Sequence, residues 1–381
     1  MTTTTARSAG PALDALLQRR IRQDVKSMHA YAIQESAGMV KLDAMENPHR
    51  LPVELQEALG KRLGALALNR YPDGRVNDLR QALAAYSQMP EDCDIMLGNG
   101  SDELISLLAM ACDVAVDPVT GKKPVILAPL PGFVMYAMSA ALQGLDFVGV
   151  PLTADFALDE AAMLAAIAQS QPAIVYLAYP NNPTANLWER GAMERVVAAA
   201  GLVGSLVVID EAYQPFSSRT YLDAIRAQPE AHTHVLLMRT LSKFGLAGVR
   251  LGYMMGPKAL IAEVDKVRPP YNISVLNYEC ALFALEHQEV FAAQALEIRA
   301  QRAMLLEALG SMKGVKSWSS DANMVLVRVT DAQITFDGLK ARRVLVKNVS
   351  KMHPLLAQCL RLTVGTADEN SLLLAALQES I

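Results

Sequence analysis

The run His234-Val-Leu-Leu-Met-Arg-Thr-Leu-Ser-Lys-Phe-Gly-Leu-Ala-Gly-Val-Arg250 joins a nearly continuous apolar segment to a glycine-containing turn. Its first part, His234–Met238, is typical of a strand that is buried on both faces of a sheet. Lys243 lies just past the end of that strand and follows Ser242. A lysine in this place can form a Schiff base with an aldehyde, while the hydroxyl, the backbone N–H groups and Arg250 hold a phosphate. Taken alone, Lys243 is more often a solvated surface charge, so the remaining strand ends decide between the two interpretations.

Short apolar runs of the same kind recur along the chain and alternate with helix-like stretches. The runs are Asp94–Leu97, Pro124–Ala128, Leu145–Val150, Ala173–Tyr179, Ser205–Ile209 and His234–Met238. The helix-like stretches are Glu54–Leu68, Asp78–Gln88, Glu103–Ala111, Val134–Leu142, Glu160–Ala168 and Gly191–Ala200. This alternation predicts an α/β fold with a mainly parallel sheet sandwiched by helices. Gly252–Met255 predicts a further strand, for which an antiparallel orientation is open.

The sequence pattern changes after residue 273. A long helical stretch, Val275–Leu309, precedes strands at Asn323–Val329, Val344–Lys347 and Cys359–Val364 and a final helix from Glu369. This mixture predicts a smaller α+β domain. We therefore expect a large, ligand-binding domain at residues 51–273. Residues 1–50 and 274–381 are expected to form an N-terminal arm and a small C-terminal domain.

Composition limits the classes of protein to which the chain can belong. With 381 residues and a hydrophobic fraction of 52%, it can bury a large core. A net charge of −4 without a Lys/Arg block gives no reason to expect nucleic acid, and no apolar stretch is long enough for a membrane span. The N-terminus lacks a signal-peptide pattern, and the four cysteines are scattered. We expect a cytoplasmic enzyme with reduced thiols.

Two predicted strand ends carry groups suited to a phosphate or a flat ring. After Asp94–Leu97 comes Gly98-Asn-Gly-Ser-Asp-Glu103, whose glycines allow close approach and whose helix start can bind a phosphate. Phe133 follows the next strand and could stack on a planar ligand. Each feature has an ordinary alternative, namely a capped helix start and a core phenylalanine.

Two further strand ends carry groups suited to a protonated ring with a hydroxyl. Asn182 lies in a turn directly after Ala173–Tyr179. Asp210 directly follows Ser205–Ile209, and Tyr213 comes three residues later. A carboxylate at the end of a buried strand is costly unless it is paired, so Asp210 needs a cation or a helix to cap. Since ligands of open parallel sheets bind beyond the carboxyl ends of the strands, these groups should meet at one site. Together with Lys243 they match pyridoxal 5′-phosphate (PLP) part by part.

The motifs along the chain resemble those of one family, the fold-type I PLP-dependent aminotransferases of class I/II. Within it, the chain looks like the histidinol-phosphate aminotransferases. The resemblance covers nearly the whole chain and rests on Glu46-Asn-Pro48, Tyr71-Pro72, Gly98-Asn-Gly-Ser-Asp-Glu103, Tyr179-Pro-Asn-Asn-Pro-Thr184, Asp210-Glu-Ala-Tyr213, Ser242-Lys243, Arg250, Lys347-Asn-Val349, His353-Pro-Leu-Leu356 and Cys359-Leu-Arg-Leu-Thr-Val-Gly365.

The resemblance implies a role for each matching residue. Lys243 would form the Schiff base with PLP, Asp210 would keep the pyridine nitrogen protonated, and Tyr213 completes the catalytic set. The remaining cofactor-binding residues would be Asn182 at the ring oxygen, Phe133 on the ring, and Ser101, Asp102, Ser242 and Arg250 at the phosphate. Tyr71 would reach that phosphate from a partner subunit, which implies a homodimer with the active site at its interface. Arg361, Lys347, Tyr31 and Asn47 would bind the substrates.

Three departures from the family pattern concern phosphate recognition and one turn. Ala185 stands where glycine is usual after Asn-Pro-Thr, so the turn must avoid a positive φ or accept strain. The spacing from Lys243 to Arg250 is one residue shorter than in many relatives. Lys347 stands where arginine is frequent, and its point charge would bind a phosphate less directionally than a guanidinium.

The implied reaction takes an amino group from a phosphorylated amino alcohol, L-histidinol phosphate, and gives it to 2-oxoglutarate in histidine biosynthesis. Two alternatives on the same site are a broad aromatic amino acid aminotransferase and a decarboxylase of threonine phosphate. A binding protein without activity would have little need of Lys243, Asp210 and Tyr213 together. Metal-dependent hydrolysis is poorly supported, because the six histidines form no HExxH motif.

Overall fold

The computed structural model describes residues 10–28, 34–72, 76–114 and 116–381. The chain divides into two units, Met1–Ala37 and Gly38–Ile381, which are described separately. The described part of the first unit contains the helices α1 (Pro11–Arg20) and α2 (Gln23–Ser27). No described helix is both long and apolar enough to cross a membrane.

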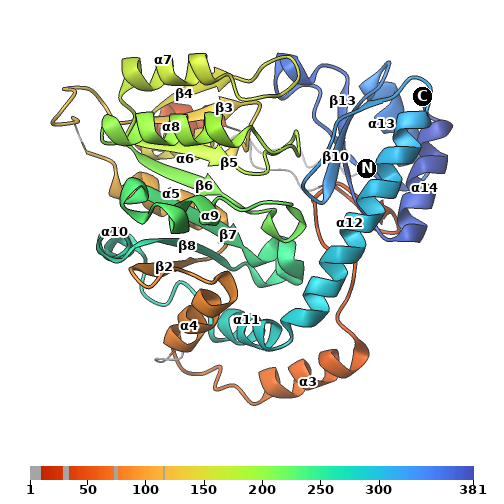
Figure 1. Cartoon of the computed structure of the whole chain (residues 1–381), viewed down its shortest axis with the longest axis horizontal. Coiled ribbons are helices and arrows are strands. Elements are labelled where there is room, and N and C mark those ends of the chain that lie inside the picture. Colours follow the sequence, from red (N-terminus) through yellow and green to blue (C-terminus); the bar gives the residue numbers. More distant parts are fainter. Residues whose placement is uncertain (1–9, 29–33, 73–75, 115) are drawn as a thin grey trace. The chain divides into compact units, whose positions relative to one another are not determined.

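A seven-stranded sheet forms the centre of the described part of Gly38–Ile381 (Figure 1). Its strand order is β2-β8-β7-β6-β5-β3-β4. The strands are β2 (Cys93–Gly98), β3 (Val125–Leu130), β4 (Asp146–Pro151), β5 (Ile174–Ala178), β6 (Leu206–Asp210), β7 (Val235–Thr240) and β8 (Gly252–Pro257). Neighbours pair in parallel except at β8, which is antiparallel to both β2 and β7. The predicted mainly parallel sheet is confirmed, and the further strand takes the antiparallel orientation.

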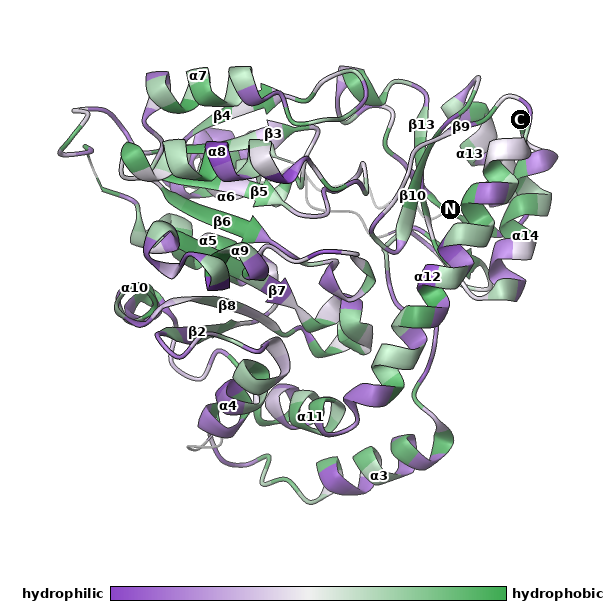
Figure 2. Ribbon diagram, viewed as in Figure 1, coloured by the Kyte–Doolittle hydropathy of each residue, from purple (hydrophilic) through white to green (hydrophobic). Residues whose placement is uncertain are grey.

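Helices cover both faces of this sheet. Along each strand, alternate residues enter different cores: Val207 and Ile209 pack on one face, and Val208 packs on the other. The first face is covered by α4 (Val76–Ser87), α7 (Glu160–Ser170), α8 (Arg190–Leu202), α9 (Leu222–Ala227) and α11 (Val275–Glu286). The second is covered by α5 (Ser101–Ala111), α6 (Met135–Gln143) and α10 (Lys258–Val264). Because both faces are buried, the strands are hydrophobic along most of their length (Figure 2).

A second core packs around a four-stranded sheet with the order β12-β13-β10-β9. Its strands are β9 (Lys316–Ser317), β10 (Met324–Arg328), β12 (Lys347–Asn348) and β13 (Cys359–Thr363), all antiparallel to their neighbours. A short parallel pair joins β1 (Val40–Lys41) to β11 (Val344–Leu345). The remaining helices are α3 (Val53–Gly64), α12 (Gln288–Ser311), α13 (Ala332–Ala341) and α14 (Ala367–Gln378).

Two predicted elements are divided in the structure. The single helix expected over Val275–Leu309 is two helices, because His287 leaves the helical region with φ −117° and ψ 33°. The break lets α11 contact α3 and α4 while α12 contacts β9 and β10. The strand expected over Val344–Lys347 is likewise split, since β11 pairs with β1 and β12 pairs with β13.

Candidate active site

A pocket lies where the carboxyl ends of β5, β6 and β7 meet the start of α5. It has a volume of about 120 Å³ and is lined by Met45, Ser101, Asp102, Phe133, Tyr136, Ala178, Pro180, Asn182, Asp210, Ala212, Tyr213, Thr240, Ser242, Lys243 and Arg250. Except for Tyr71, every residue predicted from the sequence to bind the cofactor lines this pocket. The predicted side chains therefore lie together, because parallel strands end at the same edge of a sheet.

Lys243 reaches the pocket from a short helical turn, η3 (Ser242–Leu246), that follows β7. Its Nζ donates a hydrogen bond to the backbone oxygen of Ala44 at 3.0 Å and lies 5.9 Å from the ring centre of Tyr213. Burial, and next the positive charge of Arg361, lower the pKa of Lys243 from 10.5 to about 8. Such an amine is partly neutral near physiological pH, as a nucleophile or a general base requires.

Asp210 ends β6 and is only 5% exposed. Both carboxylate oxygens accept hydrogen bonds: Oδ2 from the Tyr136 hydroxyl at 2.6 Å and Oδ1 from the Ala212 backbone N–H at 3.0 Å. Burial raises the pKa of Asp210 to about 6, and these two hydrogen bonds oppose that rise. Sequence reasoning missed Tyr136. The available signal was its position three residues after Phe133, at the start of a helix that packs against the strand ends.

An anion site forms at the N-terminus of α5. Gly100 precedes this helix with φ 81°, and no side chain caps the free N–H groups at the start of the helix. Gly252 lets β8 lie close to the start of α5, because a Cβ at this position would meet the Ser101 nitrogen at 2.7 Å. Arg250 donates to Ser242 Oγ at 3.2 Å, and its Nη2 lies 3.5 Å from Asp102 Oδ2. Free N–H groups, a hydroxyl and a guanidinium together suit a phosphate.

Arg361 connects the second sheet to the pocket. It is 7% exposed, and its two terminal nitrogens donate to Asn182 Oδ1 and to the Asp43 backbone oxygen, each at 2.8 Å. Lys347 is paired directly opposite Arg361 in the β12–β13 ladder. Residues opposite one another in an antiparallel pair project to the same face, so the two cations lie next to each other.

Four described residues that the sequence predicts for the site do not line this pocket, namely Arg361, Lys347, Asn47 and Tyr71. Asn47 instead donates to the Phe244 backbone oxygen at 3.3 Å and to Gln294 at 2.9 Å, so it contacts the chain next to Lys243. Tyr71 is 77% exposed and stacks on Tyr271, with ring centres 4.6 Å apart. Tyr31 lies outside the described residues.

The turn after Asn-Pro-Thr accepts a positive φ rather than avoiding it. Ala185 has φ 63° and is fully buried. Its backbone N–H donates to the Asn181 oxygen and its carbonyl accepts from the Asp321 N–H, each at 2.8 Å. These bonds, together with burial, hold a conformation that glycine would adopt without strain.

The donor set of the pocket fits PLP. A buried carboxylate with a raised pKa gains most from a cationic partner, and a pyridinium N–H is such a partner. The amine of Lys243 and the anion site supply the two other contacts that an aldehyde with a phosphate needs. The side chains of the pocket therefore suit PLP in their charge and in their hydrogen-bonding groups.

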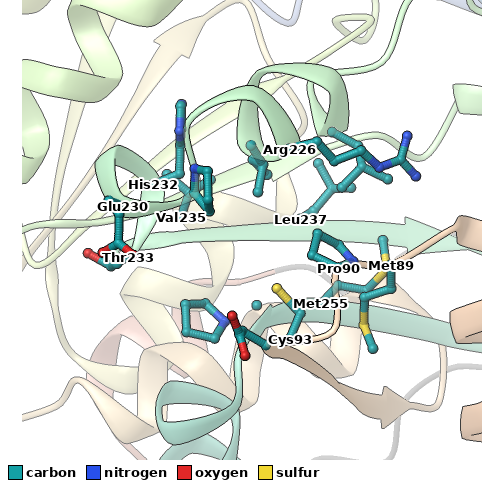
Figure 3. Close-up of a pocket in the computed structure, with 16 residues that line it drawn as sticks. Met89, Pro90, Cys93, Arg226, Glu230, His232, Thr233, Val235, Leu237 and Met255 are labelled. Atoms are coloured by element: carbon teal, nitrogen blue, oxygen red, sulfur yellow. The ribbon is translucent and has the colours of Figure 1, made fainter.

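A second, more apolar pocket of about 260 Å³ lies at the opposite end of β7 (Figure 3). Met89, Leu237 and Met255 line it, with Arg226 at its edge. Arg226 donates hydrogen bonds to the backbone oxygens of Ser87 and Gln88. This pocket contains none of the site residues predicted from the sequence.

Comparison with known proteins shows the family of this chain. Residues 37–377 match the model of the family described as aminotransferase class I and II. The chain is 72% identical to the histidinol-phosphate aminotransferase of Polaromonas naphthalenivorans (strain CJ2) over 97% of this chain and 98% of that protein. It is 67% identical to the enzyme of the same name from Paracidovorax citrulli (strain AAC00-1), over 95% and 97% of the two chains.

A solved structure has the same fold. The crystal structure of histidinol-phosphate aminotransferase from Sinorhizobium meliloti in complex with pyridoxal-5′-phosphate matches with a TM-score of 0.79 and 25% identity. The match covers 95% of this chain and 97% of that one. The chain therefore belongs to the class I and II aminotransferase family, and within it to the histidinol-phosphate aminotransferases.

Proposed function

We propose that this protein transfers the amino group of L-histidinol phosphate to 2-oxoglutarate, giving 3-(imidazol-4-yl)-2-oxopropyl phosphate and L-glutamate. PLP is its cofactor, and the reaction belongs to histidine biosynthesis in the cytoplasm. The observation that carries the chemistry is the pocket in which Lys243, Asp210 and the anion site at α5 converge. The high identity to enzymes named for this substrate supports the choice of donor.

PLP, when bound, supplies an aldehyde that condenses with amines and a ring that accepts an electron pair from the substrate carbon. In the proposed arrangement, the Asp210 carboxylate contacts the pyridine nitrogen and keeps it protonated. Asn182 and Tyr213 donate hydrogen bonds to the ring oxygen, and Phe133 packs on the ring. The phosphate is held by Ser242, Arg250 and the N–H groups of Ser101 and Asp102.

Lys243 would hold the cofactor through its aldehyde until the donor amine takes its place. The released amine of Lys243, whose pKa is lowered, would then act as the base that takes the proton from the substrate carbon and would deliver it to the cofactor carbon. The Ala44 backbone oxygen accepts a hydrogen bond from this amine at 3.0 Å. That carbonyl is therefore placed to hold the released lysine within reach of the reacting carbon.

Arg361 and Lys347 are proposed to bind the acidic groups of both substrates. The donor carries a phosphate and the acceptor two carboxylates, so two neighbouring cations serve both half-reactions. Asn47 is proposed to help bind the substrates. Its side chain donates a hydrogen bond to the Phe244 carbonyl, next to Lys243. Tyr31 is proposed to complete the substrate pocket.

A homodimer completes the proposal, with Tyr71 reaching the cofactor phosphate of the partner subunit. The support is that Tyr71 is exposed and is not among the residues that line the pocket of its own chain. An exposed stack of two aromatic rings, Tyr71 on Tyr271, is also a surface typical of a protein interface. The large cofactor-binding domain at residues 51–273 and the smaller domain are likewise proposed.

The test is an absorption titration of the PLP-loaded protein with L-histidinol phosphate and no oxo acid. We expect the long-wavelength band of the lysine-bound cofactor to give way to the band of the cofactor's amine form. If L-histidinol phosphate leaves the spectrum unchanged and an aromatic amino acid alters it, the protein is a broad aromatic aminotransferase instead. Release of carbon dioxide from threonine phosphate without amino transfer would identify a decarboxylase.

A further inference from the structure

The Tyr136 hydroxyl forms a buried hydrogen bond to the carboxylate that is proposed to hold the cofactor ring. Tyr136 lies in the first turn of α6, is 2% exposed, and donates to Asp210 Oδ2 at 2.6 Å. The other carboxylate oxygen accepts from the Ala212 N–H at 3.0 Å. These two donors, one from a helix and one from the backbone after β6, fix the plane of the carboxylate.

The ring of Tyr136 is itself fixed by two aromatic contacts. It stacks on Tyr176 of β5 with ring centres 4.3 Å apart and an angle of 9° between planes. It also makes an edge-on contact with Phe133, with centres 5.6 Å apart and an angle of 84°. Phe133 and Asp210 both line the pocket, so one tyrosine contacts both the ring-stacking side chain and the carboxylate.

We propose that Tyr136 is a positioning residue for the cofactor ring, whose hydroxyl keeps the Asp210 carboxylate ionised and oriented toward a protonated pyridine nitrogen. The inference rests on the proposed PLP chemistry. Tyr136 acts through Asp210 and is not assigned a contact with the reacting atoms.

The physical basis is the cost of a buried charge. Burial favours the neutral form of Asp210, and a hydrogen bond donated to the carboxylate favours the charged form. Other titratable groups also face Asp210: the acids Asp102 and Glu211 act on it through their charge, while Tyr176 and Tyr213 stay neutral because burial raises the pKa of their hydroxyls. The acids among them also disfavour the charged form of Asp210. Without the Tyr136 hydroxyl, Oδ2 would lose its donor and the carboxylate would be free to turn and to protonate.

The chain offers a matched control in the adjacent ring of the stack. Tyr176 is fully buried, and its hydroxyl has no hydrogen-bond partner among the described residues. Tyr136→Phe and Tyr176→Phe therefore delete the same atom from two stacked rings. The first change removes a bond to Asp210, while the second removes none, so effects of packing are common to both variants.

The experiment measures the equilibrium affinity of the apoproteins for two probes, PLP and 1-deaza-PLP, in which a C–H group replaces the ring nitrogen. We expect Tyr136→Phe to weaken PLP binding about tenfold, because a hydrogen bond to a charged group is lost. Binding of 1-deaza-PLP should change little, since no pyridinium is present to pair with Asp210. Tyr176→Phe should bind both probes as the wild-type protein does. Circular dichroism and the thermal midpoint establish that both variants are folded.

Three outcomes would overturn the inference. Equal weakening for PLP and 1-deaza-PLP would mean that Tyr136 acts only through packing. Wild-type affinity of Tyr136→Phe for PLP, with normal transamination, would remove the positioning role and leave the proposed function intact. A wild-type protein that binds no PLP would overturn both.

Discussion

At the scale of single residues, Lys243 carries the most direct prediction. Lys243→Ala should still bind PLP through the phosphate and ring contacts, but without a covalent bond to the chain. Because the same amine is proposed to act as general base, the transamination rate should fall by about a hundredfold to ten-thousandfold. Mass spectrometry after borohydride reduction, together with a coupled glutamate assay, checks both expectations. Lys258→Ala, at an exposed lysine on α10, is the control and should behave as wild type. Normal turnover of Lys243→Ala would refute the mechanism.

The buried carboxylate of Asp210 predicts a specific pH dependence of apoprotein stability. Its pKa is raised from 3.8 to about 6, so the folded state binds the proton more tightly than the unfolded state does. The tighter proton binding stabilises the folded state fully below pH 3.8, and this stabilisation is lost as the pH rises through about 6. Relative to Asp210→Asn, the wild-type apoprotein should lose about 3 kcal/mol of unfolding free energy across that window.

Urea unfolding of both apoproteins at several pH values measures this difference. The comparison with Asp210→Asn cancels the contribution of the other titratable groups. A difference that stays constant from pH 4 to 7 would show that Asp210 does not carry the raised pKa.

Replacing Arg361 is expected to slow the half-reactions of both substrates. Arg361→Ala removes a buried cation and its bonds to Asn182 and to the Asp43 carbonyl. Loss of a charge-assisted contact to an acidic group should cost about 2 kcal/mol, or some thirtyfold in kcat/KM, in each half-reaction. Single-turnover measurements with L-histidinol phosphate and with 2-oxoglutarate separate the two halves. Arg342→Ala, at an exposed arginine just after α13, is the control. An effect on only one substrate would contradict the shared role.

At the scale of elements, a buried ion pair holds together the ends of the strands that carry the site. Arg239 on β7 contacts Glu211, the residue after β6, at 2.8 Å, and their side chains are 7% and 0% exposed. Thr220 and the Tyr221 N–H complete the hydrogen bonds of this carboxylate. Removing one partner of such a pair leaves an uncompensated buried charge.

Arg239→Ala should therefore lower the free energy of unfolding by about 3–5 kcal/mol. Arg195→Ala is the matched control, because its pair with Glu160 is exposed and should contribute under about 1 kcal/mol. Chemical denaturation of the two variants checks the contrast. Equal losses in both would mean that burial of the pair has no energetic consequence.

The elements also show what sequence patterns could predict. The strands of the large sheet were predictable because a strand that is buried on both faces has an apolar run in its sequence. The predicted strand Ser205–Ile209, for example, overlaps most of β6 (Leu206–Asp210). The break at His287 was not predictable, because the sequence stays helix-favouring there and tertiary packing sets the new direction. Helix α13 was missed, although Asp331 caps it through hydrogen bonds from the Gln333 and Ile334 N–H groups.

The same contrast holds for the site. Lys243, Asp210 and Asn182 could be found because each lies at or just past the end of a strand, and strand ends meet at one edge. Tyr136 could not be found in this way, since its proposed role depends on where its ring, on α6, stacks on Tyr176 of β5. The contacts of Asn47 were also hidden, because they join segments 197 and 247 residues apart in the sequence.

At the scale of the whole molecule, the site is assembled from distant parts of the chain. Arg361 binds the carbonyl of Asp43, and Lys243 binds that of Ala44, across 318 and 199 positions of sequence. The segment from Asp43 to Asn47 thus contacts both the residues after β7 and the second sheet. The site consequently depends on the completed fold of Gly38–Ile381 rather than on one local motif.

The proposed homodimer predicts that two inactive variants restore activity when they are combined. If Tyr71 completes the partner's site, a mixed dimer of Tyr71→Ala and Lys243→Ala contains one site with both residues intact. Unfolding and refolding an equimolar mixture should restore roughly a quarter of the wild-type sites, because half of the dimers are mixed and each carries one such site. Each variant refolded alone is the control. Only a site shared between subunits can combine the intact Tyr71 of one variant with the intact Lys243 of the other. If the mixture is no more active than the average of these controls, Tyr71 therefore acts within its own subunit or not at all.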